Sequence, residues 1–362
     1  MKCRMAYRWI RVICLSFFIC QLSFSEAHAQ TDFIRVRAND AESLLNAISQ
    51  ANEQNRETTA SRLYIMIPNG VYHLKDRTLT AITGHNIALV GESMRGTVII
   101  NKPAVENEGI SKTATLLNRG TNLYLQDLTL KNDLDYYKSG AAGRAVCLQD
   151  KGTRTICKNV CMLSYQDTYY TDNEKGETYL ENAEIHGTVD FICGAGDTYF
   201  NRCTIVTERR NRDGSGHTVI AAPRTADTPW GYVFESCAVY NRMSDFVFAR
   251  GWHTKPHCTW LNTMLMSPEK LIETRFDPKG MRTVDSKFYE YQTVDAQGQE
   301  IAPRTNVVTF TLNDEKNTVE TILTTEEASQ YELEKIFPDW RPEKIVRKLM
   351  KHTTWLQQLL FQ

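Results

Sequence analysis

A short pattern of residues recurs through the middle of the chain and limits the possible folds more than any other feature. Each copy has an apolar residue, two mostly polar ones, a small or apolar one, a variable one and a final apolar one. The copies are LQDLTL (125–130), CKNVCM (157–162), LENAEI (180–185), FNRCTI (200–205), FESCAV (234–239) and WLNTML (260–265). Short strand-like repeats at intervals of mostly 20 to 35 residues are typical of a solenoid built from stacked coils.

We therefore predict an all-β fold, a right-handed parallel β-helix. In such a fold the strands of successive coils lie about 4.8 Å apart, and equivalent positions of the repeat stack on one another. Val160, Ala183, Cys203 and Cys237 occupy the same position in their copies and should form an interior ladder. A β-sandwich also uses short strands, but the signals for hairpins between these segments are weak.

Helical patterns are confined to the two ends of the chain. Residues 39–54 place apolar residues at helical spacing behind Asn39 or Asp40 and predict an N-terminal capping helix. No further convincing helix follows before about Met266. Residues 324–337 favour a helix capped by Thr325, and the basic, apolar-striped segment 341–362 favours another, which either caps the solenoid end or contacts another surface.

The first residues of the chain have the pattern of an export signal. Basic residues precede a short apolar run, and the small-x-small sequence AHA at 27–29 is suited to cleavage. An uncleaved membrane anchor is the alternative, although the apolar run is short for a membrane span. We expect a secreted or periplasmic protein with a signal peptide at 1–29, a β-helix catalytic domain at 30–312 and a helical extension at 313–362.

Charge and cysteine content exclude some classes of function. The 42 basic and 43 acidic residues give a net charge of −1, without the basic excess typical of nucleic-acid-binding proteins. Seven cysteines follow the signal, and none has a C-x-x-C zinc spacing. We expect most of them to be buried thiols, and we expect no metal, no nucleic acid and a monomeric chain.

Two aspartates, Asp167 and Asp190, lie 23 positions apart among uncharged and aromatic neighbours. That interval is about one coil, so their side chains should stack about 5 Å apart. Two carboxylates at such a distance resist being ionised together, and one pKa rises. A proton donor would then lie beside a charged nucleophile. The alternative is that each aspartate only accepts hydrogen bonds from the backbone.

Four motifs occur in a coherent order around these residues, and together they indicate a protein family. They are GRAVCL (143–148), YQDTYY (165–170), GTVDFICG (187–194) and FARGWHTKP (248–256). Together they resemble the pectin methylesterases, carbohydrate esterases of the β-helix type that remove methyl groups from galacturonan. The resemblance covers about residues 35–337, and it implies methyl-esterified pectin as the substrate, with no metal or organic cofactor.

The resemblance also implies a role for each matching residue. Asp190 would be the nucleophile, and Asp167 the general acid that later becomes the base. Gln166 would donate a hydrogen bond to the oxyanion, and Arg250 would orient Asp190. The predicted contacts with the sugar are Trp252, Phe191, Tyr169 and Tyr165.

The chain departs from the family pattern at several positions. Arg144 stands where an oxyanion glutamine is usual; its guanidinium could donate to the oxyanion or to a uronate carboxylate, or form a salt bridge elsewhere. Ala249 and Gly251 replace the glycine and proline beside Arg250, and Cys193 replaces a phenylalanine. The basic start of residues 209–217 could touch an acidic polymer, although a solvated loop is the commoner structure.

Three functions remain open from the sequence. A pectin methylesterase would release methanol without cutting the polymer. Another polysaccharide enzyme on the same fold, a glycosidase or a lyase, is the second possibility, because two carboxylates about 5 Å apart also suit a retaining glycosidase. The third is a non-catalytic pectin-binding solenoid, inactivated by the change at Arg144.

Overall fold

The computed structural model describes residues 32–139, 143–225, 228–242, 244–253, 255–281, 283 and 285–361. The chain divides into two units, Met1–Thr31 and Asp32–Gln362, and the account below concerns the second. The predicted signal peptide lies outside the described residues. Within the described part, no helix combines the length and the apolar character needed to cross a membrane.

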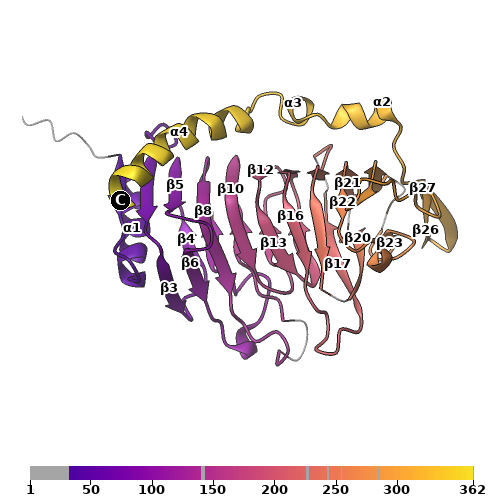
Figure 1. Cartoon of the computed structure of the whole chain (residues 1–362), viewed down its shortest axis with the longest axis horizontal. Coiled ribbons are helices and arrows are strands. Elements are labelled where there is room, and N and C mark those ends of the chain that lie inside the picture. Colours follow the sequence, from indigo (N-terminus) through magenta and orange to yellow (C-terminus); the bar gives the residue numbers. More distant parts are fainter. Residues whose placement is uncertain are drawn as a thin grey trace, which may run out of the picture. The chain divides into compact units, whose positions relative to one another are not determined.

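The described residues form a parallel β-helix, as predicted (Figure 1). The larger sheet contains β1 (Phe33–Arg35), β2 (Leu63–Ile67), β3 (Gly70–Lys75), β5 (Ile87–Gly91), β6 (Thr97–Asn101), β8 (Tyr124–Asn132), β10 (Thr155–Leu163), β12 (Glu177–Glu181), β13 (Glu184–Gly187), β15 (Asp197–Asn201), β16 (Thr204–Thr207), β18 (Tyr232–Glu235), β19 (Ala238–Asn241), β21 (His257–Leu261), β22 (Met264–Leu265), β24 (Lys287–Tyr291) and β25 (Val294–Asp295). Its strands all pair in parallel with strands of neighbouring coils, which excludes the sandwich.

The second sheet carries the residues of the predicted site. It contains β4 (Thr80–Ile82), β7 (Leu116–Asn118), β9 (Leu148–Asp150), β11 (Tyr169–Thr171), β14 (Val189–Gly194), β17 (His217–Pro223), β20 (Asp245–Arg250) and β23 (Phe276–Asp277), again paired in parallel. A separate antiparallel hairpin, β26 (Val307–Leu312) and β27 (Glu315–Glu320), follows the last coil. The predicted domain boundary at 312 falls in the turn of this hairpin.

The strand register explains the sequence repeat. The first residue of each copy stacks on the next inside the solenoid; Phe200 lies 4.2 Å from Phe234, and Phe234 lies 3.8 Å from Trp260, measured between ring centroids. The fourth position forms the predicted ladder, and its residues Val160, Ala183, Cys203 and Cys237 are buried. All seven cysteines of the described part are free and buried, as expected for most of them.

The third position of each copy has a left-handed backbone. Positive φ values occur at Asp127, Asn159, Asn182, Arg202, Ser236 and Asn262. Such a conformation is unfavourable for most residues but tolerated by Asn and Asp. It turns the chain at one corner of every coil, so that apolar residues on both sides of the corner face the core.

Helix α1 (Ala41–Gln54) confirms the predicted N-terminal helix. Asp40 is its N-cap, and the carboxylate accepts a hydrogen bond from the Ser43 amide at 2.9 Å. Leu44 and Ile48 are buried in the main core, so α1 covers the first coils. Short 3₁₀ helices η1 (Val105–Asn107) and η2 (Pro268–Lys270) lie in loops.

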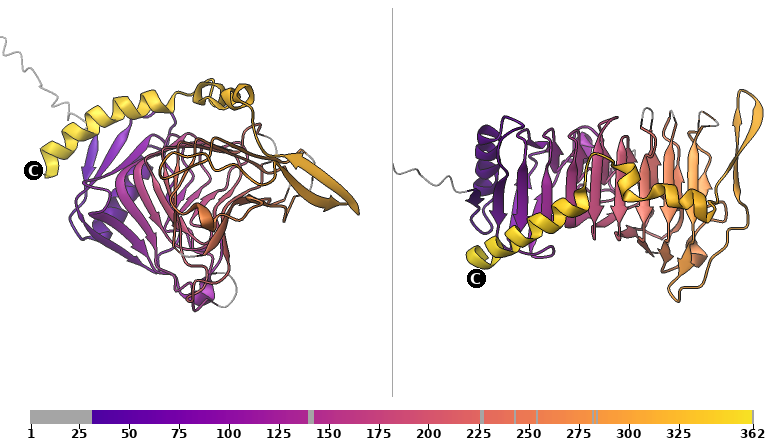
Figure 2. Two further views of the ribbon diagram at one scale, coloured as in Figure 1. Left: turned by 45° about the vertical axis from the view of Figure 1, so that its right-hand side comes forward. Right: turned by 90° about the horizontal axis from the view of Figure 1, so that it is seen from above.

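The C-terminal segment is helical, but it lies along the solenoid. α2 (Thr325–Ala328), η3 (Ser329–Tyr331) and α3 (Leu333–Ile336) lead into α4 (Pro342–Phe361), which runs back across successive coils (Figures 1 and 2). On α4, Thr353 donates to Gln126 at 2.9 Å and Gln357 to the Gly91 carbonyl at 2.7 Å. Of the two alternatives for segment 341–362, capping of the solenoid end is therefore wrong, and contact with another surface is confirmed. The cap of α2 is Thr324 rather than Thr325, because the Thr324 hydroxyl accepts from the Glu327 amide.

Candidate active site

Asp167 and Asp190 lie on successive coils, as their spacing predicts. Tyr169 in β11 pairs with Ile192 in β14, and this register extends back to the two aspartates because the Asp167 amide donates to the Val189 carbonyl at 3.2 Å. Both aspartates have a left-handed backbone, with φ of 57° and 50°. The strands therefore begin with a local turn that only a few residue types accept readily.

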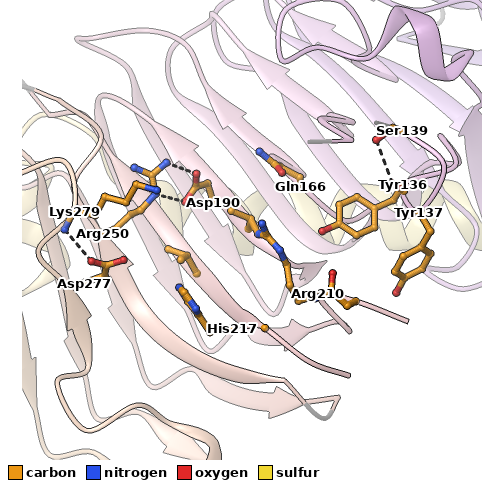
Figure 3. A pocket seen from close by; sticks show the side chains of 14 residues that line it. Tyr136, Tyr137, Ser139, Gln166, Asp190, Arg210, His217, Arg250, Asp277 and Lys279 are labelled. Carbon is orange, nitrogen blue, oxygen red and sulfur yellow. Dashed lines mark hydrogen bonds and ion pairs between the residues drawn. The ribbon is translucent and has the colours of Figure 1, made fainter. Parts of the chain in front are cut away.

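The two carboxyl groups line one small pocket with a volume of about 150 Å³. It contains all five predicted catalytic residues; its lining residues are Ile110, Arg144, Gln166, Asp167, Asp190, Cys193, Arg250 and Trp252. A larger hollow of about 700 Å³ adjoins it and shares Gln166, Asp190 and Arg250 (Figure 3). The pocket thus opens into a space large enough for further sugar residues.

Arg250 holds Asp190 through two hydrogen bonds. Its Nε donates to Asp190 Oδ1 at 2.7 Å, and its Nη2 donates to the other carboxylate oxygen. The Arg250 Nη1 donates to the Gly251 carbonyl at 2.9 Å, which fixes the guanidinium plane. A bidentate pair of this kind fixes the orientation of the carboxylate, so the Asp190 oxygens are held at the pocket wall.

Asp167 lies in a different environment. It is 4% exposed, and among the described residues no hydrogen bond to its carboxyl group is present. Burial raises the pKa of Asp167 well above its usual value, and the charge of Asp190 raises it further, although Arg144 and Arg250 act in the opposite direction. The pocket therefore combines a buried carboxyl group whose pKa is raised with an arginine-paired carboxylate.

Arg144 lines the pocket but is also salt-bridged. Its Nε and Nη2 donate to the two carboxylate oxygens of Glu108 at 3.1 and 2.8 Å, and its backbone amide donates to the same group at 3.2 Å. The pair with Arg144 lowers the pKa of Glu108. The salt bridge that the sequence left open thus exists, although Arg144 still lines the pocket and its charge acts on Asp167.

Comparisons with known proteins identify the family. The family model described as Pectinesterase matches residues 35–325. The chain belongs to the pectinesterase family. Pectinesterase A of Dickeya chrysanthemi is 28% identical over 328 residues, covering 77% of this chain and 83% of the relative. Putative pectinesterase 11 of Arabidopsis thaliana is 28% identical over 223 residues, covering 56% and 60% of the two chains.

Solved structures of the family share the fold. Pectin methylesterase PemA from Erwinia chrysanthemi superposes with a TM-score of 0.64 at 26% identity, covering 82% of this chain and 93% of that chain. A pectin methylesterase in complex with a hexasaccharide gives the same TM-score, identity and coverage. In that structure, a solenoid of this kind is seen with an oligosaccharide bound.

The predicted sugar contacts divide into two groups. Trp252 lines the pocket, with its ring 6.1 Å from Tyr170 and below the Arg224 guanidinium at 5.6 Å. Tyr169 and Phe191 are fully buried in the main core. The prediction of a substrate contact is wrong for these two residues, because alternate side chains of a strand point to opposite faces. Tyr165 is partly exposed and stacks on another tyrosine of the hollow.

That tyrosine, Tyr136, belongs to a wall that the sequence did not reveal. The rings of Tyr136 and Tyr165 are parallel with centroids 4.8 Å apart, and Tyr137 meets Tyr165 edge-on at 5.4 Å. The Tyr137 hydroxyl donates to the Arg209 carbonyl at 3.0 Å. Arg210 also lines the hollow (Figure 3), so the basic segment borders it. The sequence feature that could have indicated this wall is the pair Tyr136 and Tyr137 in an otherwise polar loop.

One further cluster has ligand types that suit a metal. Atoms of Cys161, Glu184 and His186 lie within 4.8 Å of one another. The Arg95 guanidinium already bonds both Glu184 and Cys161, and Glu208 bonds the His186 ring. A cation would have to displace the Arg95 guanidinium. None of these residues lines the catalytic pocket or the hollow, and we assign the cluster no part in the reaction.

Proposed function

We propose that the chain is a pectin methylesterase that hydrolyses methyl esters of galacturonan to pectate and methanol. The proposal rests on one observation, the shared pocket of Asp190 and Asp167. The Asp190 carboxylate accepts hydrogen bonds from Arg250, whereas burial raises the pKa of Asp167. Ester hydrolysis needs a nucleophile and a proton donor side by side.

In the first half of the reaction, an Asp190 carboxylate oxygen attacks the ester carbonyl carbon. The carbonyl π electrons move to oxygen, and the resulting oxyanion accepts hydrogen bonds from Gln166 and Arg144, both on the pocket wall. The tetrahedral intermediate then collapses. The C–O bond to the methoxy group breaks, and Asp167 supplies the proton that releases methanol.

In the second half, water cleaves the anhydride that links Asp190 to the substrate. The Asp167 carboxylate, now deprotonated, accepts a proton from water as the water attacks the former ester carbon. A second oxyanion forms at the same donors, and its collapse expels the Asp190 carboxylate. Asp167 ends the cycle protonated, as it began.

The hollow beside the pocket would bind the polymer on either side of the reacting ester. Trp252 supplies an aromatic face in the pocket, and the Tyr136, Tyr137 and Tyr165 cluster supplies others along the hollow. We further propose that the chain acts on methyl-esterified pectin as a monomer after export. Residues 1–29, the proposed signal peptide, would be absent from the mature enzyme.

Product analysis on methyl-esterified polygalacturonate tests the proposal. We expect one methanol for each new carboxylate, with no new reducing ends and no unsaturated products. New reducing ends would indicate a glycosidase, and unsaturated ends a lyase. Binding of the polymer without methanol release would show a non-catalytic solenoid. Each of these three results would overturn the proposed function.

A further inference from the structure

The salt bridge between Glu108 and Arg144 joins a residue of the pocket wall, Arg144, to a carboxylate behind that wall. Glu108 follows η1 and its side chain is 16% exposed, while that of Arg144 is 39% exposed. The Glu108 carboxylate accepts from the side chain and the backbone of Arg144 together. Three bonds to one carboxylate fix the position of the guanidinium more firmly than an ordinary surface ion pair does.

The bonding leaves one side of the guanidinium free for the pocket. Glu108 occupies Nε and Nη2 of Arg144, and no acceptor among the described residues bonds Nη1. Arg144 shares the pocket with Gln166 and Asp167. A residue of the pocket wall is thus held by a carboxylate that itself lies outside the pocket lining.

Both members of the pair act electrostatically on Asp167. The Arg144 cation lowers the pKa of Asp167 and the Glu108 anion raises it, after the larger effects of burial and of Asp190. The remaining groups that face Asp167 are the Arg250 guanidinium and the Cys193 thiol. Since the two charges of the pair oppose each other, the net field at Asp167 depends on their balance.

We propose that Glu108 is a positioning residue that fixes the Arg144 guanidinium beside the pocket and neutralises its charge, so that the acid product leaves easily. The inference rests on the proposed esterase function. The product carries a new carboxylate at the reacting carbon. An uncompensated guanidinium would hold that carboxylate by charge-assisted hydrogen bonds.

The two single substitutions should move the pH profile in opposite directions. Glu108→Gln removes the anion, so the pKa of Asp167 falls and the alkaline limb of kcat moves to lower pH by roughly half a unit. Arg144→Gln removes the cation, so the limb moves to higher pH by a similar amount. The double variant should return close to the wild-type limb. Glutamine at 108 can still accept from Arg144, so the fold should be kept.

Product inhibition gives a second measurement. With de-esterified trigalacturonate as inhibitor, Glu108→Gln should lower the inhibition constant about threefold to tenfold, because Arg144 is then free to pair with the product. Arg144→Gln should not lower it. A matched control is Glu177→Gln, which breaks the Arg154 pair at 3.0 Å outside the pocket and should change neither limb nor inhibition.

The outcomes separate this inference from the proposed function. If the wild type releases no methanol, the function itself fails. If the wild type is active but Glu108→Gln and Arg144→Gln leave the alkaline limb of kcat unchanged, or shift it in the same direction, Glu108 has no positioning role. Unchanged inhibition in folded Glu108→Gln, verified by its unfolding curve, would also overturn the inference. A purely structural salt bridge would lower stability without opposite shifts of the limbs.

Discussion

Two corners of the solenoid use the same backbone conformation for different purposes. In the larger sheet, left-handed residues such as Asp127 and Asn159 turn the chain in each coil, and in the second sheet Asp167 and Asp190 have the same sign of φ. In both corners the side chains stack from one coil to the next. The backbone alone therefore does not distinguish a structural corner from a catalytic one.

The difference lies in what the side chains bond. The Asp127 carboxylate accepts from Asn159 at 2.8 Å and from Gln357 of α4 at 3.0 Å, so the fold itself satisfies it. Asp167 is as buried as a core residue, yet no described residue bonds its carboxyl group. The Asp167 carboxyl group instead lines the pocket, and carboxyl groups whose pKa is shifted by burial and by a neighbouring charge are concentrated at functional sites.

The largest expected effect comes from the same substitution at the two corners. Asp190→Asn should lower kcat for methanol release by at least about 10³-fold, because an amide is a poor nucleophile. Asp127→Asn should keep activity within about twofold and lower the free energy of unfolding by about 1 kcal/mol, since one acceptor is lost. Methanol release and chemical unfolding check both variants. Equal activity in the two would remove the distinction between the corners.

A smaller effect is expected at the aromatic wall of the pocket. Trp252→Ala should raise KM about tenfold with a lesser change in kcat, because stacking of a ring on a sugar contributes about 1.4 kcal/mol. The control is Tyr240→Ala, at a tyrosine that is 42% exposed and lines neither cavity. A rise in KM for the control as large as that for Trp252→Ala would contradict the assignment.

The smallest effect concerns stability at the catalytic corner. Because burial raises the pKa of Asp167, folding favours its protonated form, and this contribution is lost as pH rises from the unfolded value through the raised folded value. Asp167→Asn has no such loss, so its Tm should exceed that of the wild type by a few degrees at pH 8 and match it near pH 4. Thermal unfolding at both pH values measures this. A variant less stable at pH 8 would contradict the account.

The fold could be predicted from the sequence because each coil of a solenoid needs the same pattern of apolar and turn residues. The apolar positions of the six copies predicted the interior ladder, and the Asn and Asp residues at the third position are the types that tolerate a left-handed corner. The spacing of Asp167 and Asp190 predicted their shared pocket for the same reason, since one coil of backbone sets the register. The positions of Arg250 and Trp252 in the pocket were predicted from the motif at 248–256.

Contacts outside the repeat could not be predicted from the sequence. The contact between Arg144 and Glu108 joins residues 36 positions apart in two irregular loops, and no periodic pattern links them. The path of α4 depends on where its buried residues Val346, Leu349 and Leu356 pack against the coils, and the repeat does not encode that contact. Tyr169 and Phe191 were assigned to the wrong face because closeness to an aspartate in a motif does not say to which face of the strand a side chain points.

A measurement of the protonation state of Asp167 across pH tests the central claim most directly. In protein labelled with ¹³C at the aspartate carboxyl groups, the Asp167 signal can be assigned by its loss in Asp167→Asn and followed by NMR through a pH titration. The account predicts that this carboxyl group stays protonated at neutral pH in the wild type and titrates at lower pH in Asp190→Asn, where the neighbouring charge is removed. An Asp167 signal already ionised at pH 5, or one indifferent to Asp190→Asn, would contradict the pairing of the two aspartates.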